Sequence, residues 1–582
     1  MFFRLIEIIY FLINEVKLTK YKLKIAFSLF KEISIYKFIR NFFFKETYLF
    51  KNENINKYLK KNKKLNKRYQ IKNGKNILID LTLSTHPLYA IKNCYMGMEL
   101  AKLNKLNIVG NVVKNDYLTY SIAKSFGIKN FIFIDEGSFF NRLSYFIKSL
   151  KLIPENKIAK KIVSITLDKI EIGKASYEHA IRNYKYSPLR KNNFLLYLAL
   201  SKSLRSLDLS KKIFNKYQFK YYILSELQFI PNRIFFQRAL LMKIPVYSLW
   251  GNDVVGATLY KSFSKKNLSR DTVSKESSNF IIKKLFQKKN LIEKFHKNRL
   301  AKKATGGERY FKKNIKLEIS KIIKNKNELY KQFGFDIKKP IVLILPHVMI
   351  DNVLNFSSSI FLTPMFWYIE TLKKIKTIKG VNWLIKPHPS ESKYDTKLTS
   401  KNLFKNYVGD ENHVKFWSND VLVSNIDKYI NSVITCLGSA GYEYPSLGIP
   451  SITAAESRYS NFNCSISPKN KKEYFKILMN IKKLSKLDYK TKFIAKIYWF
   501  AAEKIIRVKN TSIPTFNDTK EFNQSIFWNI MRKSVNKKNK RNKKNFNEML
   551  KIQDKNQNRH TINFKEFQIQ NFKYKKIKLN DA

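Results

Sequence analysis

A run of small residues directly after an apolar segment is the feature of this sequence with the clearest chemical meaning. Residues 432–453 read SVITCLGSAGYEYPSLGIPSIT. The turn between strand and helix is made of Gly438, Ser439, Ala440 and Gly441. Small side chains let a ligand approach the backbone, and N–H groups at a helix start attract anions. The pattern predicts a phosphate site. Glu443 is expected to accept from ribose or sugar hydroxyls, or else to be an acid favoured by the helix dipole.

A Lys-Pro-His-Pro loop follows a second apolar segment. Residues 381–391 read VNWLIKPHPSE, so Lys386 ends the predicted strand and His388 stands between two prolines that fix the backbone. Open α/β sheets bind ligands at the carboxyl ends of their strands. Lys386 and His388 are therefore expected to contact a phosphate, the alternative being a rigid turn. His347 follows a third strand and is expected either to line the same site or to cap a helix.

Three acids follow predicted strands in the N-terminal half and are candidates for a general base. They are Glu136, Glu226 and Asp253. A carboxylate at such a position can take the proton of an acceptor hydroxyl. Each has an alternative role as a helix cap or a lysine partner. His86 follows a strand in the same half and is either an acceptor-site residue or a turn histidine.

These residues are positioned by two blocks in which apolar strands alternate with helices. The first block has predicted strands at 76–83, 106–109, 130–134, 221–224 and 244–249, with helices at 90–103, 117–126 and 233–242. The second has predicted strands at 341–345, 383–386, 414–416, 432–435 and 451–454, with a helix at 363–378. Such alternation indicates βαβ units and parallel sheets.

The predicted fold class is therefore α/β, with two Rossmann-like domains facing a cleft, a helical N-terminal extension and a basic disordered C-terminal tail. The predicted segments are a basic helical extension (1–70), an N-terminal acceptor domain (71–262), a helical connection (263–337), a C-terminal nucleotide-sugar domain (338–485), helices packing back on the body (486–532) and the tail (533–582).

The motifs around Lys386–His388 and Ser439–Glu443 resemble the C-terminal half of bacterial capsule-polysaccharide biosynthesis proteins. Those proteins resemble Kdo-type transferases and, more remotely, the glycerophosphotransferases of teichoic acid synthesis. The resemblance covers residues 340–455, and the N-terminal half matches in layout only. It implies the two-domain GT-B fold, with nucleotide bound mainly by the C-terminal half. Glu226 loosely resembles the base-bearing strand end of Kdo transferases, although the Pro-Asn pair at 231–232 follows at a longer spacing.

The sequence departs from that family at two places. Lys386 stands where arginine is common, and Tyr444-Pro445 stands where an alanine-rich helix is usual. Both departures leave the identity of the donor open.

Composition limits the partners. The formal net charge of +69 has two explanations. One is an A/T-rich codon bias, since Lys, Asn, Ile, Phe and Tyr are all abundant, and the other is a role in binding an anionic membrane. No nucleic-acid motif is present, so no nucleic-acid partner is expected. The cysteines, Cys94, Cys436 and Cys464, are far apart, which fits a reducing compartment. No uncharged apolar run of about 20 residues appears, and the segment 1–16 is expected to be an amphipathic helix docked on protein or on a membrane surface.

These features together predict a metal-independent glycosyltransferase with no cofactor besides its nucleotide-sugar substrate. It would act on a surface polysaccharide or glycolipid, in the cytoplasm and in part at the inner membrane face. A polyol-phosphate transferase using a CDP-activated donor and a non-catalytic assembly or export protein are the alternatives. A sugar-nucleotide epimerase shares the layout, but such chains are much shorter. Membrane association is expected to be peripheral and salt-sensitive.

Overall fold

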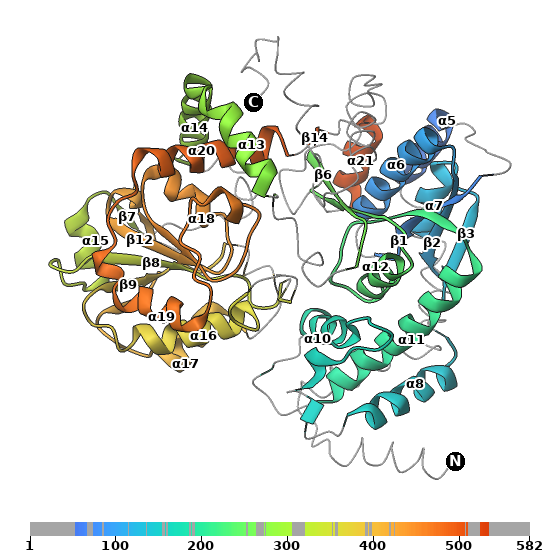
Figure 1. Cartoon of the computed structure of the whole chain (residues 1–582), viewed down its shortest axis with the longest axis horizontal. Helices are drawn as coiled ribbons and strands as arrows, with labels where there is room; N and C mark the ends of the chain where they lie inside the picture. The colour runs from blue at the N-terminus through green and yellow to red at the C-terminus, as the bar shows by residue number, and fades with distance from the viewer. Residues whose placement is uncertain are drawn as a thin grey trace.

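Two sheets of mostly parallel strands form the body of the protein in this computed structural model (Figure 1). The structure describes residues between 53 and 534, apart from 67–73, 264–272, 305–320, 510–523 and gaps of one to four residues. The predicted α/β class with two Rossmann-like sheets is confirmed.

The N-terminal sheet has the strand order β14-β6-β5-β4-β1-β2-β3. Its strands are β1 (Asn76–Leu81), β2 (Asn107–Val113), β3 (Asn130–Ile134), β4 (Phe219–Leu224), β5 (Val246–Trp250), β6 (Val254–Tyr260) and β14 (Val508–Lys509). The five strands from β5 to β3 are parallel, whereas β6 pairs antiparallel with β5 and β14 with β6. Five of the six β1 residues are buried, as expected for a strand covered on both faces.

Helices cover this sheet and extend beyond it. They are α6 (Pro87–Asn104), α7 (Tyr117–Ser125), α8 (Phe139–Leu152), α10 (Ile172–Asn183), α11 (Phe194–Lys216) and α12 (Asn232–Leu241). No helix was predicted for α8, α10 or α11, which lie together beside the sheet in Figure 1. The antiparallel strand β6 was not predicted either, and β2 continues four residues past its predicted end.

The C-terminal sheet is parallel throughout, with the order β10-β9-β8-β12-β13. Its strands are β8 (Ile341–Leu345), β9 (Asn382–Ile385), β10 (Val414–Phe416), β12 (Ile430–Thr435) and β13 (Ser451–Thr453). The helices that connect them are α16 (Pro364–Ile375), α17 (Ser400–Tyr407) and the four-residue α18 (Ala440–Glu443), which is followed by a short 3-10 helix, η4 (Pro445–Leu447).

The region between the sheets is not only helical. It contains α13 (Lys275–Phe286), α14 (Lys289–Ala304) and α15 (Lys326–Phe333), together with a short strand, β7 (Lys321–Ile323), that pairs with β11 (Val421–Val423). The sequence predicted a helical connection over 263–337, and the strand β7 was not part of that prediction. The three-residue strand forms because its partner strand, about 100 residues away, supplies backbone bonds that no local pattern reveals.

Two late helices return to the body. In α20 (Tyr489–Lys504), Lys496 forms an ion pair of 2.6 Å with Glu293 of α14. In α21 (Gln524–Ser534), the ring of Trp528 lies 5.3 Å from that of Tyr58, which belongs to the first described helix, α5 (Glu53–Leu65). The last described helix therefore packs on the N-terminal half.

The predicted helix at 1–16 and the predicted tail beyond residue 534 lie outside the described residues. Within the described part of the chain, no helix is both long enough and apolar enough to cross a bilayer.

Each sheet has one point at which the strand order reverses. In the N-terminal sheet it lies between β1 and β4, and in the C-terminal sheet between β8 and β12. The crevice outside the carboxyl ends of the strands at such a point is where open α/β sheets bind ligands. The two reversal points therefore define where the candidate residues have to lie.

Candidate functional site

The small-residue turn lies at the reversal point of the C-terminal sheet. The Thr435 hydroxyl at the end of β12 donates to the Leu345 carbonyl at the end of β8, at 3.1 Å. The same hydroxyl accepts from the N–H of Gly438, at 3.3 Å. The turn is thereby tied to both central strands. Cys436 beside it is fully buried.

Gly441 is required by packing. The hydroxyl of Tyr459 donates to the Gly438 carbonyl at 2.7 Å and so holds the turn from behind. A Cβ at position 441 would lie 2.0 Å from that hydroxyl oxygen. The expected reason for this glycine was close approach of a ligand. The structure adds a different one, because any larger residue displaces the buried Tyr459 ring.

The turn offers fewer free backbone donors than the sequence suggested. The N–H groups of Gly441 and Tyr442 donate to the carbonyls of Gly438 and Ser439, each at 3.0 Å, and Glu443 donates to Ser439 as well. At most the N–H groups of Ser439 and Ala440 are left to meet a ligand. The helix also begins two residues earlier than predicted, at Ala440, and is only four residues long because a proline at 445 tightens the chain into η4.

Lys386, His388 and His347 gather at the same edge. The Lys386 ammonium lies 4.3 Å from the centroid of the Trp417 ring, and the side chain is exposed. The imidazole rings of His347 and His388 lie 6.2 Å apart, centroid to centroid. Strands β9 and β12 flank β8, so their ends lie about 10 Å apart. This edge of the sheet carries two imidazoles, one ammonium and the Ser439 turn.

A buried glutamate anchors the Lys-Pro-His-Pro loop. The Glu391 carboxylate accepts from the N–H and from the hydroxyl of Ser400, at the start of α17, each at 2.8 Å. Its own N–H donates to the His388 carbonyl at 2.9 Å. Burial raises the pKa of Glu391 above its ordinary value. We assign Glu391 a positioning role that the sequence did not suggest, because Ser400 becomes its partner only in the fold.

Glu226 lies at the reversal point of the N-terminal sheet, just after β4. The hydroxyl of Tyr89 on α6 donates to its carboxylate at 2.8 Å. One turn further along α6, the buried Lys92 donates to the Gly251 carbonyl at 2.9 Å, and its ammonium lies 4.8 Å from the Tyr89 ring centroid. Tyr89 and Lys92 were missed by the sequence analysis, since nothing local marks them.

The other two candidate acids and the candidate histidine cannot be placed. Glu136, Asp253 and His86 lie outside the described residues. Asp135, the neighbour of Glu136, forms an exposed ion pair of 2.8 Å with Lys114. Pairing with a lysine is the alternative role that the sequence left open for the candidate acids, and Asp135 has it at this strand end.

A buried aspartate holds the segment that carries Glu226. The Asp80 carboxylate in β1 accepts from the Thr82 hydroxyl at 2.9 Å and from the side-chain amide of Asn232, the first residue of α12. On the other side of the segment, the Ser225 hydroxyl donates to Asn93 at 2.6 Å, and Asn93 donates to the Asp80 carbonyl at 2.8 Å. Both ends of the segment 225–232 are thus fixed to β1 and α6.

Burial raises the pKa of Asp80 to about 6, and hydrogen bonds from its neighbours lower it only in part. An acid whose pKa is higher in the folded than in the unfolded chain loses stabilisation as the pH rises through the folded value. The wild-type protein should therefore lose up to about 3 kcal/mol of stability from this group between about pH 4 and pH 7. Asp80→Asn lacks this titrating group, so the melting temperature of the variant minus that of the wild type should increase as the pH rises over that interval.

Thermal melts at half-unit pH steps test this expectation. The exposed Asp410→Asn serves as the matched control and should leave the pH dependence as it is. A pH dependence in Asp80→Asn that is the same as that of the wild type would contradict the account.

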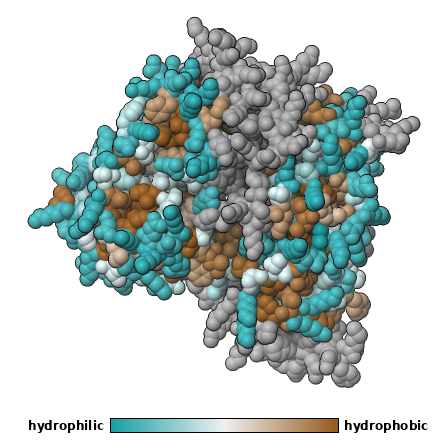
Figure 2. Space-filling model, in the orientation of Figure 1, coloured by the Kyte–Doolittle hydropathy of each residue, from teal (hydrophilic) through white to brown (hydrophobic). Residues whose placement is uncertain are grey.

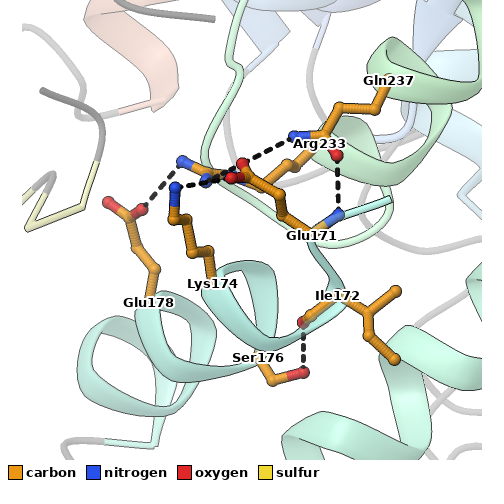
Figure 3. Close-up of polar contacts among 7 residues, drawn as sticks. All are labelled: Glu171, Ile172, Lys174, Ser176, Glu178, Arg233 and Gln237. Carbon is orange, nitrogen blue, oxygen red and sulfur yellow. Dashed lines mark hydrogen bonds and ion pairs between the residues drawn. The ribbon is translucent and has the colours of Figure 1, made fainter. Parts of the chain in front are cut away.

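A buried ionic cluster fixes the start of α12 against α10 (Figure 3). Arg233 lies 3.5 Å from a carboxylate oxygen of the buried Glu178 and 3.9 Å from one of Glu171. Gln237 donates to Glu171 at 3.1 Å and accepts from its N–H at 2.8 Å, while Lys174 pairs with it at 2.6 Å. A buried charge needs such partners to offset its desolvation. The cluster therefore rigidly joins α10 to the helix that follows Glu226.

Two contacts among the described residues join the halves near the carboxyl ends of strands. The Arg458 guanidinium, in the loop after β13, lies 4.2 Å from the ring centroid of Trp250 at the end of β5. Arg182 of α10 lies 3.7 Å from the Asp351 carboxylate after β8 and 4.4 Å from the Tyr394 ring centroid. The segments that follow β8 and β13 thus contact the N-terminal half near the carboxyl end of β5 and at α10.

Among the described residues, no group of three or more His, Cys, Asp or Glu side chains is placed to hold a metal ion.

No protein-family model matches this chain, and no curated protein matches it in sequence. Several solved structures are similar to it. One is Thermosulfurimonas dismutans KpsC, a beta Kdo 2,4 transferase, with 11% identity over 48% of this chain and 79% of that chain and a TM-score of 0.27. Another is the UDP-GlcNAc 2-epimerase of Neisseria meningitidis, with 11% identity over 79% and 99% of the two chains and a TM-score of 0.21.

A third similar structure is the N-terminal domain of Candida albicans trehalose-6-phosphate phosphatase, with 9% identity over 81% and 98% of the two chains and a TM-score of 0.28. The predicted likeness to Kdo transferases thus recurs among the matches. Identities and TM-scores this low assign no substrate and no reaction.

Substitution of Gly441 by valine is expected to lower both stability and nucleotide affinity. The new side chain would force Tyr459 out of its buried position, and overpacking of this kind costs about 1–3 kcal/mol. Movement of Tyr459 would also release the Gly438 carbonyl and shift the turn. Thermal melts with and without nucleotide measure both effects.

Gly380→Val is the matched control, because a Cβ there meets only the flexible Lys482 side chain, at 4.0 Å. Full nucleotide affinity in a folded Gly441→Val protein would show that the turn is not part of the nucleotide site.

Proposed function

We propose that this chain is a glycosyltransferase that moves a sugar from a nucleotide-activated donor to a polysaccharide or glycolipid acceptor. The observation that carries the proposal is the convergence of Lys386, His388, His347 and the Ser439 turn at the carboxyl edge of the C-terminal sheet. The carboxylate of Glu226 follows β4, at the carboxyl edge of the other sheet.

The basic edge suits a departing nucleotide. As the bond between the anomeric carbon and the phosphate oxygen breaks, the electron pair stays on the phosphate, which gains negative charge. The ammonium of Lys386 and the imidazole of His388 would stabilise that charge more in the transition state than in the ground state. The N–H groups of Ser439 and Ala440 would contribute two neutral donors, and Glu443 would accept from ribose or sugar hydroxyls. This scheme requires no metal ion.

The acidic edge suits the acceptor. The acceptor hydroxyl attacks the anomeric carbon and loses its proton, which Glu226 would take as general base. Tyr89 orients the Glu226 carboxylate, and the Asp80 and Arg233 clusters fix the segments on either side of it. Glu136 and Asp253 remain candidates for the same role.

Two other functions use the same geometry. A polyol-phosphate transferase would place its CDP-activated donor at the same basic edge, since the site recognises phosphate rather than sugar. A non-catalytic assembly or export protein would bind polysaccharide between the sheets and would not depend on nucleotide.

A thermal-shift screen separates these functions, because a ligand of the native state raises the melting temperature by mass action. The wild-type chain is tested with UDP-, GDP-, CMP- and CDP-linked sugars, with CDP-glycerol and with the free nucleotides. Stabilisation by a sugar nucleotide supports the transferase, and stabilisation by CDP-glycerol alone supports the polyol-phosphate alternative. A protein that no nucleotide stabilises would contradict both and favour the assembly protein.

A further inference from the structure

Helix α8 presents an apolar stripe to the outside of the molecule. Phe140 is 73% exposed, Leu150 43% and Ile147 37%. At 100° per residue, these three side chains fall within about 80° of the helix circumference. Figure 2 shows apolar side chains gathered over α8 and α11 at the lower right of the view.

The opposite face of α8 is already used by the fold. The Ser149 side chain on that face is buried, and Phe146, which borders the stripe beside Leu150, packs against Phe194 of α11 with ring centroids 5.5 Å apart. The Tyr145 hydroxyl donates to Asp208 of α11 at 2.7 Å. The outer stripe is therefore not the core-facing side of the helix.

Basic side chains border the stripe. Lys148 and Lys151 are both exposed and belong to the same two turns as Ile147 and Leu150. Asp208 of α11, an acid that α8 contacts, accepts a hydrogen bond from Tyr145. Apolar side chains flanked by ammonium groups are suited to an anionic bilayer. The apolar side chains enter the boundary between headgroups and acyl chains, and the ammonium groups bind lipid phosphates.

We propose that the outer face of α8 (Phe140, Ile147, Leu150, Lys148 and Lys151) docks the protein on an anionic lipid surface. The helix starts five residues after the carboxyl end of β3, so it lies on the side of the sheet that also carries Glu226. A lipid-linked acceptor would then reach the acceptor edge from the docked face. Docking itself does not depend on the transfer reaction.

Vesicle flotation of the full chain tests the proposal. The wild type is mixed with phosphatidylcholine vesicles that do or do not contain phosphatidylglycerol, at low and at high salt. It should float with the anionic vesicles at low salt. The variant Phe140→Ser/Ile147→Ser and the variant Lys148→Glu/Lys151→Glu should each partition at least about tenfold less.

Matched controls change the same residue types elsewhere on the surface. Met479→Ser/Tyr489→Ser removes two exposed apolar side chains, and Lys472→Glu/Lys476→Glu reverses two exposed lysines on α19 (Lys471–Met479). Both controls should float like the wild type. Circular dichroism melts show whether each variant is folded.

Three outcomes would overturn the proposal. The first is a wild-type protein that binds neither vesicle type or both equally. The second is an equal loss in the α8 variants and the lysine control, which would assign binding to total charge. The third is normal flotation of the α8 variants together with a change in oligomeric state by size-exclusion chromatography, which would assign the face to a second copy of the chain. Failure of the transferase proposal would appear separately, as a missing nucleotide response.

Discussion

The substitution Glu226→Gln should reduce turnover of the sugar nucleotide and acceptor by about 10²- to 10⁴-fold, the usual contribution of a general base. Glutamine keeps the size of the side chain and can still accept from Tyr89, which now donates to the carboxylate at 2.8 Å. Only the ability to take the acceptor proton is removed. Nucleotide affinity should stay unchanged, because nucleotide is expected at the other sheet.

Steady-state kinetics with the donor found by the thermal-shift screen measure this effect. Glu136→Gln and Asp253→Asn are the comparators, as both acids also follow strands of the N-terminal half. If either of them abolishes turnover while Glu226→Gln does not, the base has been assigned to the wrong strand end. Tyr89→Phe should cause a smaller loss, since it alters the orientation of the carboxylate but not its charge.

The double substitution Lys386→Ala/His388→Ala should weaken nucleotide binding by at least about 100-fold. Hydrogen bonds to charged groups contribute about 1.5–3 kcal/mol each, and this variant removes two such donors from the edge of the sheet. Both side chains are at least partly exposed, so their loss should leave the melting temperature without ligand nearly unchanged. Isothermal titration calorimetry measures the affinity directly.

Lys338→Ala is the matched control for that variant. Lys338 is also exposed, but it precedes β8 and so lies at the amino end of the same sheet. A comparable loss of affinity in Lys338→Ala would mean that the excess positive charge of the chain, rather than this edge, attracts the nucleotide. Comparing the two variants therefore separates the site from the net charge.

Much of the fold could be predicted because parallel strands are buried on both faces and read as short apolar runs. The bounds of β3, β8 and β10 were predicted to the residue. The strand β6 was missed because it runs antiparallel to β5 and contains a glycine at 256, which packs under the Trp250 ring. Partners distant in sequence also determine β7 and β14, which are only three and two residues long.

The positions of Lys386, His388 and Ser439 after the ends of strands could be predicted from the sequence, because each follows a short apolar run. The candidate site was not predictable where a residue acts through a distant partner. Tyr459 supports the turn at Gly438, and Asp80 holds the start of α12 about 150 residues away. An aspartate inside an apolar strand was the one local signal of the Asp80 network, since an acid in such a strand needs buried partners.

The most direct test of the proposed nucleotide site is hydrogen–deuterium exchange of the wild-type chain with and without the sugar nucleotide that stabilises it. Bound nucleotide should slow exchange in peptides spanning 345–350, 386–391 and 437–444, which follow the carboxyl ends of β8, β9 and β12. Peptides at the amino ends of the same strands should be unaffected. Protection confined to the amino ends of the strands, or to α15 and the connection around it, would contradict the account.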